Sequence, residues 1–273
     1  MSRYQYISDR ELKVDLFPIP YKELGAFFLI FIRVAGILVM VPFFNARVIP
    51  VLSKTGVAFV VALVLLPVIS IGNVEFPDTV FGITKVIFVE AIIGMIIGLL
   101  VNVFFEGVRL MGQLVGFQTG FAIANVLDPH SGGQISILSN MAYLLAIVLF
   151  LIFNGHHILL SAMEESFEII QVGSLRVDGQ IVRKILQEVA NMFGLSIRIG
   201  APAVASLLFT QVAFGLITRL IPQMNIMIVA FPVQIVIGLF FFGLSLTVMM
   251  GVIEKYVGEL NQLLITTMSY LKV

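Results

Sequence analysis

The sequence predicts an all-α, polytopic membrane protein, and three observations lead to this fold class. Hydrophobic residues make up 59% of the 273 residues and charged residues only 12%, whereas a soluble domain has about 25% charged residues. Six apolar segments each come close to the roughly 20 residues that a helix needs to cross ~30 Å of hydrocarbon. The 16 basic and 16 acidic residues balance, and no basic tail or stripe indicates nucleic acid.

The apolar segments follow a polar N-terminal extension, residues 1–23. This extension mixes basic and acidic side chains and lacks the basic start and apolar core of a cleavable signal, so we expect the first span to direct insertion. The helical membrane domain then covers residues 24–253. Its apolar segments are residues 24–44, 51–71, 80–103, 135–153, 197–221 and 226–253. The charges that flank the first spans favour opposite orientations, so the sequence leaves the orientation of the termini open.

Two polar regions lie beside the last two apolar segments. Residues 164–188 are rich in charged side chains, and Gly173 and the turn at residues 176–179 are expected to divide this linker into two helical pieces. Residues 254–273 place apolar side chains at helical spacing with polar residues between them. This pattern predicts an amphipathic C-terminal helix that lies on the membrane or on a partner.

The segment 107–133 is too apolar for a water-exposed loop and too broken for a lipid-facing helix. Gly112, Gly116 and Gly120 recur every fourth residue, a spacing that lets another backbone come close. The amide of Gln118 needs hydrogen-bond partners that hydrocarbon cannot provide. We therefore expect protein, and not lipid, to cover this segment.

Seven charged residues fall where lipid would otherwise lie, and each costs roughly 2.5–3.5 kcal/mol at the centre of a membrane helix. They are Arg33, Lys85, Glu90, Glu106, Arg109, Arg198 and Arg219. Glu106 and Arg109 are spaced to pair on one helix. The charges indicate either an ion or proton pathway or, as the interpretation that we favour, pairing at subunit interfaces and snorkelling near span ends.

The chain lacks the sequence patterns that are typical of catalytic sites. The chain has no cysteine, no glycine-rich phosphate loop and no Gly-x-Ser-x-Gly turn. Its histidines, His130, His156 and His157, do not show the spacing with carboxylates that metal sites use. The sequence therefore predicts a protein that is not an enzyme and that needs no metal or cofactor.

Five ordered motifs resemble the FliR family of the flagellar type III export apparatus, over about residues 24–251. The motifs are GFQTGFAIANVLDP (116–129), FNGHH (153–157), GAPA (200–203), RLIPQMN (219–225) and FPVQIVIGL (231–239). The resemblance implies helices paired as hairpins and a place in the flagellar basal body of the bacterial inner membrane. It also implies FliP-like and FliQ-like subunits and an FlhB-like protein as partners, and unfolded flagellar proteins as export substrates.

The resemblance further implies which residues close the gate. It assigns a pore plug to Gly116, Phe117, Gln118, Thr119 and Gly120, and we add the neighbouring Phe121. Thr119 stands where the family more usually has Met. Packing against neighbouring subunits is expected at Gly94, Gly98, Gly112, Pro222, Gln223 and Asn225, because glycine rows and tight turns let helices approach closely.

Two alternatives stay open at this point. The virulence-associated secretion counterpart of the same family would use the same kind of gate for effector proteins. A secondary transporter would explain the charges and the proline breaks of the C-terminal third, although no inverted repeat of apolar segments is visible.

Overall fold

Helices are the regular secondary structure of the described residues. The computed structural model describes residues 21–45, 49–69, 79–120, 136–221, 223 and 225–272. Within these ranges all regular elements are helices, which confirms the all-α prediction. They are α1 (Tyr21–Met40), α2 (Pro42–Asn45), α3 (Val51–Leu65), α4 (Val80–Gln118), α6 (Ile137–Ile152), α7 (Gly155–Ile169), α8 (Gly179–Leu220) and α9 (Ile226–Leu271).

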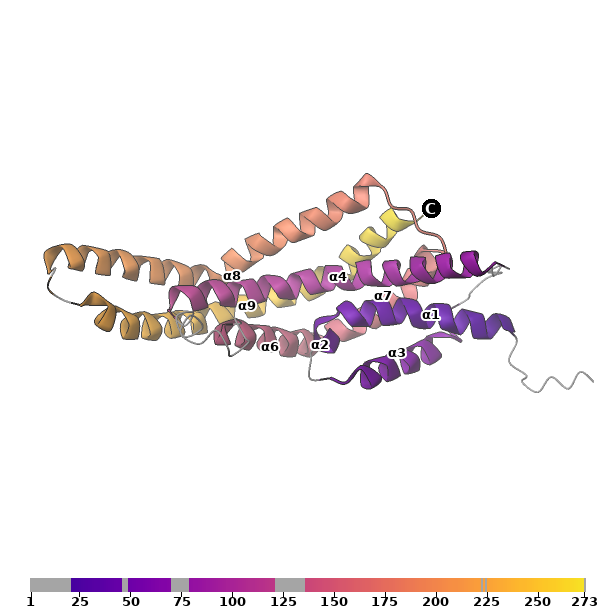
Figure 1. Ribbon diagram of the computed structural model, residues 1–273, viewed down its shortest axis with the longest axis horizontal. Coiled ribbons are helices and arrows are strands. Elements are labelled where there is room, and N and C mark those ends of the chain that lie inside the picture. The colour runs from indigo at the N-terminus through magenta and orange to yellow at the C-terminus, as the bar shows by residue number, and fades with distance from the viewer. Residues whose placement is uncertain are drawn as a thin grey trace, which may run out of the picture.

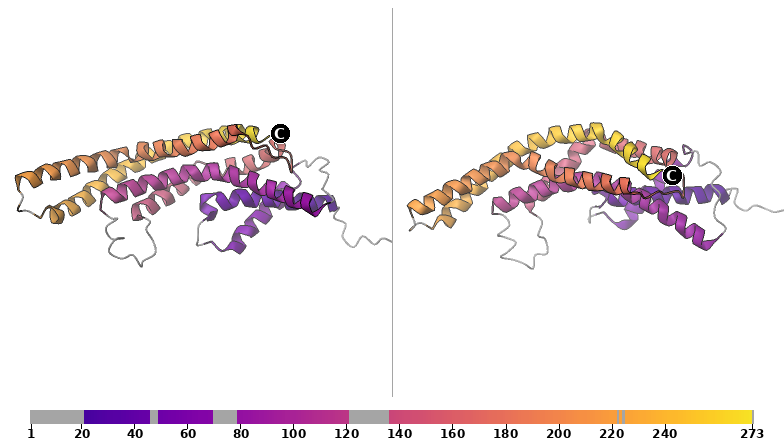
Figure 2. Two further views of the ribbon diagram at one scale, coloured as in Figure 1. Left: turned by 45° about the horizontal axis from the view of Figure 1, so that its top comes forward. Right: turned by 90° about the horizontal axis from the view of Figure 1, so that it is seen from above.

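The helices form an elongated body in which α4 runs along the middle (Figure 1). Helix α1 packs on α4 and α3 at one end, while α6 and α8 pack on α4 further along. Helices α8 and α9 form a hairpin that bends along its length and extends past the C-terminal end of α4 (Figures 1 and 2). The hairpin therefore has one end against the rest of the chain and one end that projects from it.

The number of spans is lower than the six predicted from apolar length. Four helices have the length and composition to cross a membrane, namely α1 from Glu23, α4, α8 and α9 from Ile228. The bent pair α6 and α7 brings the number to five in the described part of the chain. Helix α3 is apolar but has only 15 residues, fewer than the roughly 20 that a helix needs to cross the hydrocarbon.

The bend between α6 and α7 measures 70° and has a local cause. Asn154 takes a left-handed conformation with φ of 60°, which Asn tolerates better than most residues. A Cβ on Gly155 would overlap the ring of Phe150, so that ring packs directly on the glycine backbone. The sequence FNGHH thus makes a sharp turn and not a continuous span.

Helices α4 and α9 are longer than the sequence predicts. Helix α4 continues through residues 107–118, and the proposed C-terminal tail is the last part of α9. The tail buries Val257, Leu260, Leu264, Met268 and Leu271 within this chain, where α7 lies beside α9. Its apolar face therefore lies on its own chain, and not on the membrane or on another protein.

The polar linker, residues 164–188, contains the end of α7, a turn and the start of α8. Helix α7 ends at Ile169, and Gly173 has a positive φ of 75° in the turn that follows. Helix α8 then begins at Gly179, where the Asp178 carboxylate accepts hydrogen bonds from the backbone N–H groups of Gln180 and Ile181. The turn and the cap divide the linker into two helices.

A buried ion pair joins three helices at one end of the body. The guanidinium of Arg33 on α1 donates from Nε to Glu90 Oε2 at 2.6 Å and from Nη2 to Oε1 at 3.2 Å. Both side chains are fully buried. The same guanidinium donates to the carbonyl oxygen of Ser166 on α7 at 2.7 Å and lies 3.9 Å above the Phe167 ring. Arg33 therefore connects α1, α4 and α7.

The linker after α7 closes this network. Both terminal nitrogens of Arg33 donate to the carbonyl oxygen of Ile170, at 3.4 and 3.3 Å. The N–H of Gly173 donates to Glu90 Oε1 at 2.8 Å. The carbonyl oxygen of Ile170, the residue that caps the end of α7, is thus satisfied by a side chain. Loss of either charged group would leave the other one buried without its partner.

The first prediction concerns this pair. Replacing one partner, by Arg33→Leu or Glu90→Leu, should lower the free energy of unfolding by about 3–5 kcal/mol, because an unpaired charge stays buried. The double variant should lose less than the sum of the two. Denaturant titration in detergent micelles measures the difference. Lys255→Gln is the control, since its pair with Glu259 is 66% exposed on both sides and should change stability by less than ~1 kcal/mol. Single variants as stable as the parent chain would contradict the assignment.

The second prediction concerns a glycine of α4. A Cβ on Gly112 would overlap the backbone of Ser139 on α6, so Gly112→Ala should cost about 1–3 kcal/mol through overpacking. Gly243→Ala on α9 is the matched control, because no atom lies within 4 Å of its added Cβ. Thermal melting in detergent should separate the two variants. Equal melting temperatures would show that α4 and α6 can move apart without cost.

Candidate functional site

The predicted plug begins as the last turn of α4 and not as a loop. Gly116, Phe117 and Gln118 are helical, and Thr119 caps the helix. Gly120 has a φ of 83°, which turns the chain away from the helix axis. Phe121 and the rest of the segment to residue 135 lie outside the described residues.

The turn at the end of α4 is anchored to α9. Thr119 is fully buried, and its hydroxyl donates to the carbonyl oxygen of Gly116 at 3.0 Å. Its methyl group packs where Gly238 of α9 has no side chain. A Cβ on Gly120 would come within 2.9 Å of the Phe231 ring. These contacts hold the turn against the middle of the α8–α9 hairpin, which the FPVQIVIGL motif supplies.

Phe117 points away from this anchor. Its side chain is 64% exposed, although its neighbours Gly116 and Thr119 are buried. The Gln118 Oε1 atom is buried and has no hydrogen-bond partner among the described residues. The described part of the plug thus combines a fixed backbone with one exposed aromatic ring and one unmatched amide oxygen.

The glycine rows find their partners inside this chain. A Cβ on Gly94 would overlap the carbonyl oxygen of Arg33, and one on Gly98 would meet Ile37 and Met40. Gly112 packs on Ser139, as described above. The close backbone approach that the spacing predicts is real, but α1 and α6 provide it. Their assignment to neighbouring subunits is therefore corrected.

Other glycines have room for a side chain, and we call them open glycines. No atom lies within 4 Å of a Cβ added at Gly194, Gly215, Gly243 or Gly251, and these positions are on α8 and α9. At the tip of the hairpin, Gln223 and Asn225 are exposed, whereas Pro222 lies outside the described residues. Sequence spacing does not distinguish these glycines from the close-packed ones, because both kinds occur at helical spacing in apolar segments.

The predicted intramembrane charges fall into two groups. Arg33 and Glu90 form the buried pair, and Glu106 and Arg109 pair at 3.1 Å with Arg109 over the Tyr143 ring. Lys85, Arg198 and Arg219 are exposed. Glu106 and Arg109 thus pair on one helix, as their spacing indicates, whereas Arg33 and Glu90 pair within one subunit where the sequence analysis favoured pairing between subunits. Among the described residues, no three His, Asp or Glu side chains gather as metal ligands.

The projecting part of the hairpin is apolar on its surface. Phe209, Leu220, Ile228 and Val236 are each 68–80% exposed. This part of α8 and α9 extends beyond the end of α4 (Figure 1). Apolar surface of this kind needs cover from lipid or from another protein. The candidate functional site therefore consists of the anchored turn at the end of α4 and the uncovered hairpin beside it.

Comparison with known proteins identifies the family. Residues 24–260 match the model of bacterial export proteins, family 1. The flagellar biosynthetic protein FliR of Bacillus subtilis (strain 168) is 32% identical over 261 residues, which cover 93% of this chain and 95% of that protein. FliR of Escherichia coli (strain K12) is 25% identical over 248 residues, 91% of this chain and 94% of that protein. The chain therefore belongs to bacterial export proteins, family 1, as a membrane-embedded component of the flagellar export apparatus and not as an enzyme.

Proposed function

We propose that this chain is one subunit of the flagellar protein export gate in the bacterial inner membrane, within the flagellar basal body. In this proposal it forms a gated pore with FliP-like and FliQ-like subunits, contacts an FlhB-like protein and passes unfolded flagellar proteins. The flagellar names of the relatives favour this assignment over the virulence-associated counterpart.

The observation that carries the proposal is the uncovered surface of the α8–α9 hairpin. Lipid can cover exposed apolar side chains, but it gains nothing from open glycines, which instead allow another helix to approach closely. Gly243 and Gly251 are two turns apart on α9, with the exposed Thr247 between them. We assign this face to a neighbouring subunit.

The anchored turn at the end of α4 supports a role in closing the pore. A constriction needs an apolar group held in a defined place, because hydrophobic closure works by excluding water from a narrow gap. Phe117 meets this need, since Thr119 and Gly120 fix the backbone behind it against α9. We propose that Phe117 faces the conduit in the assembled gate.

The geometry offers less support for a secondary transporter. Transporters of that kind bind substrate at unwound helix segments near the middle of the membrane. Pro202 and Pro232 instead lie inside the continuous helices α8 and α9. The charges that suggested an ion pathway include the pair of Arg33 and Glu90, whose hydrogen bonds serve packing.

The third prediction tests the subunit contact. Gly243→Leu should leave the melting temperature of the separately purified chain unchanged, since the added side chain meets open space. It should lower co-purification with FliP-like and FliQ-like proteins about tenfold, because a bulky side chain at a close helix contact costs ~1–3 kcal/mol. Normal recovery of partners would rule out a close contact at this glycine.

The fourth prediction tests the gate. Phe117→Ser should raise the ion conductance of the assembled complex in planar bilayers, because a polar side chain lets water enter the constriction. Phe117→Leu is the control, since it keeps an apolar side chain at this position and leaves Thr119 and its contact with α9 unchanged. If Phe117→Ser conducts no more than the control, Phe117 does not form the seal.

A further inference from the structure

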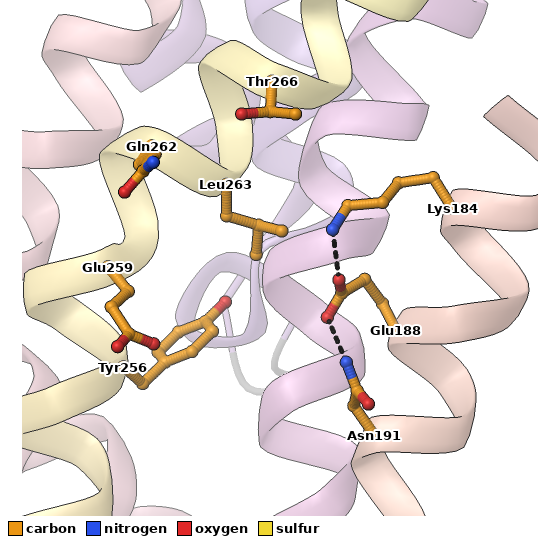
Figure 3. Close-up of a pocket in the computed structure, with 8 residues that line it drawn as sticks. All are labelled: Lys184, Glu188, Asn191, Tyr256, Glu259, Gln262, Leu263 and Thr266. Carbon is orange, nitrogen blue, oxygen red and sulfur yellow. Dashed lines mark hydrogen bonds and ion pairs between the residues drawn. The ribbon is translucent and has the colours of Figure 1, made fainter. Parts of the chain in front are cut away.

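A polar cleft lies between the first part of α8 and the last part of α9, far along the chain from the plug. Its volume is ≈ 410 Å³, and α4 lies behind it (Figure 3). Lys184 and Glu188 of α8 pair at 2.7 Å on one wall, and Asn191 donates to the same carboxylate at 3.3 Å. Tyr256 and Glu259 line the opposite wall, on α9.

One buried hydroxyl beside the cleft has no hydrogen-bond acceptor among the described residues. The Tyr256 hydroxyl is buried and has no hydrogen-bond partner among the described residues, and its ring is fixed by stacking on Phe104 at 3.6 Å. An unmatched buried hydroxyl is unfavourable, so the site gains from a ligand that brings an acceptor oxygen. The Lys184 ammonium has three N–H donors and bonds one carboxylate oxygen here.

The charges along the cleft balance. Lys184 also lines an adjoining cleft of ≈ 360 Å³ that includes Arg183. Within the polar cleft Lys184 pairs with Glu188, and Glu259 Oε1 lies 3.7 Å from Lys255 Nζ, so two basic and two acidic side chains lie along it. A balanced set of charges favours a ligand that carries both signs over a simple anion.

The cleft is also continuous with an apolar recess. A space of ≈ 130 Å³ shares Glu188, Asn191 and Tyr256 with the polar cleft, and its other walls include Leu100, Phe104 and Leu195. The site lies at the level where the polar first turns of α8 and last turns of α9 give way to the apolar parts of these helices. A polar compartment that opens into an apolar one at this level fits an amphiphile.

We propose that this cleft binds a zwitterionic phospholipid whose phosphodiester headgroup carries a primary ammonium. The phosphate oxygens accept hydrogen bonds from the Tyr256 hydroxyl and the Lys184 ammonium. The primary ammonium donates to the Glu259 carboxylate, which a quaternary ammonium cannot do. The first part of an acyl chain occupies the apolar recess. The site goes beyond the proposed export function, and its test rests on that function only for the co-expressed complex.

Lipid retention by the full chain in its co-expressed complex tests the proposal. The complex is incubated in vesicles of phosphatidylcholine with a minor fraction of phosphatidylethanolamine, purified in detergent and analysed by native mass spectrometry. The parent complex should retain phosphatidylethanolamine in preference to phosphatidylcholine. Tyr256→Phe keeps the stacked ring and removes one donor, so it should lower this retention about fivefold. Glu259→Gln should reduce the preference between the two lipids.

Matched variants separate the site from general effects. Tyr143→Phe removes a hydroxyl that bonds the Pro42 carbonyl oxygen away from the cleft, and it should leave retention unchanged. Equal retention of the two lipids by the parent complex, or no loss in Tyr256→Phe, would overturn the proposal. If the complex retains no lipid but binds soluble phosphoethanolamine, the site takes a free phosphoester and the lipid proposal is wrong. A photocrosslinker at Gln262 that captures a protein subunit and no lipid would also overturn it.

Discussion

The buried pair of Arg33 and Glu90 is the constraint on which the rest of the arrangement depends. Two charges taken out of water are tolerable only with close pairing and with partners for the remaining donors and acceptors. Here the carbonyl oxygens at the end of α7 and the N–H of Gly173 provide those partners. The network therefore holds α1, α4 and the start of the polar linker together. It sets where α8 begins, and so where the hairpin lies.

Close packing on α4 continues this constraint along the body. The rows at Gly94, Gly98 and Gly112 bring α1 and α6 against the α4 backbone, and Ser196 of α8 donates to the carbonyl oxygen of Gly107 at 2.7 Å. Because α4 is surrounded on these faces, its last turn has a fixed position. The exposed ring of Phe117 is thus presented by a rigid helix, as a constriction requires.

The sequence predicted the helix class, the division of the polar linker and the Glu106–Arg109 pair, because each depends on local spacing. It could not predict the partners of Arg33 or of the glycine rows, since those contacts join segments far apart in the chain. Apolar length overstated the number of spans for the same reason: Asn154 bends one segment sharply, and α3 ends early. The Tyr256 cleft was missed as well. Only Lys184 and Glu188, at helical spacing, signalled a polar face there.

The two ends of the α8–α9 hairpin differ in a way that bears on assembly. At one end, polar side chains line the cleft and the last turns of α9 are buried by α7, so the chain supplies most of its own contacts. At the other, the exposed apolar side chains of Phe209, Leu220 and Ile228 are left without cover within the chain. A hairpin that is fixed at one end and uncovered at the other gains most of its remaining stabilisation by joining further helices. The free energy released by assembly should therefore be concentrated at the projecting end, beside the turn that holds Phe117.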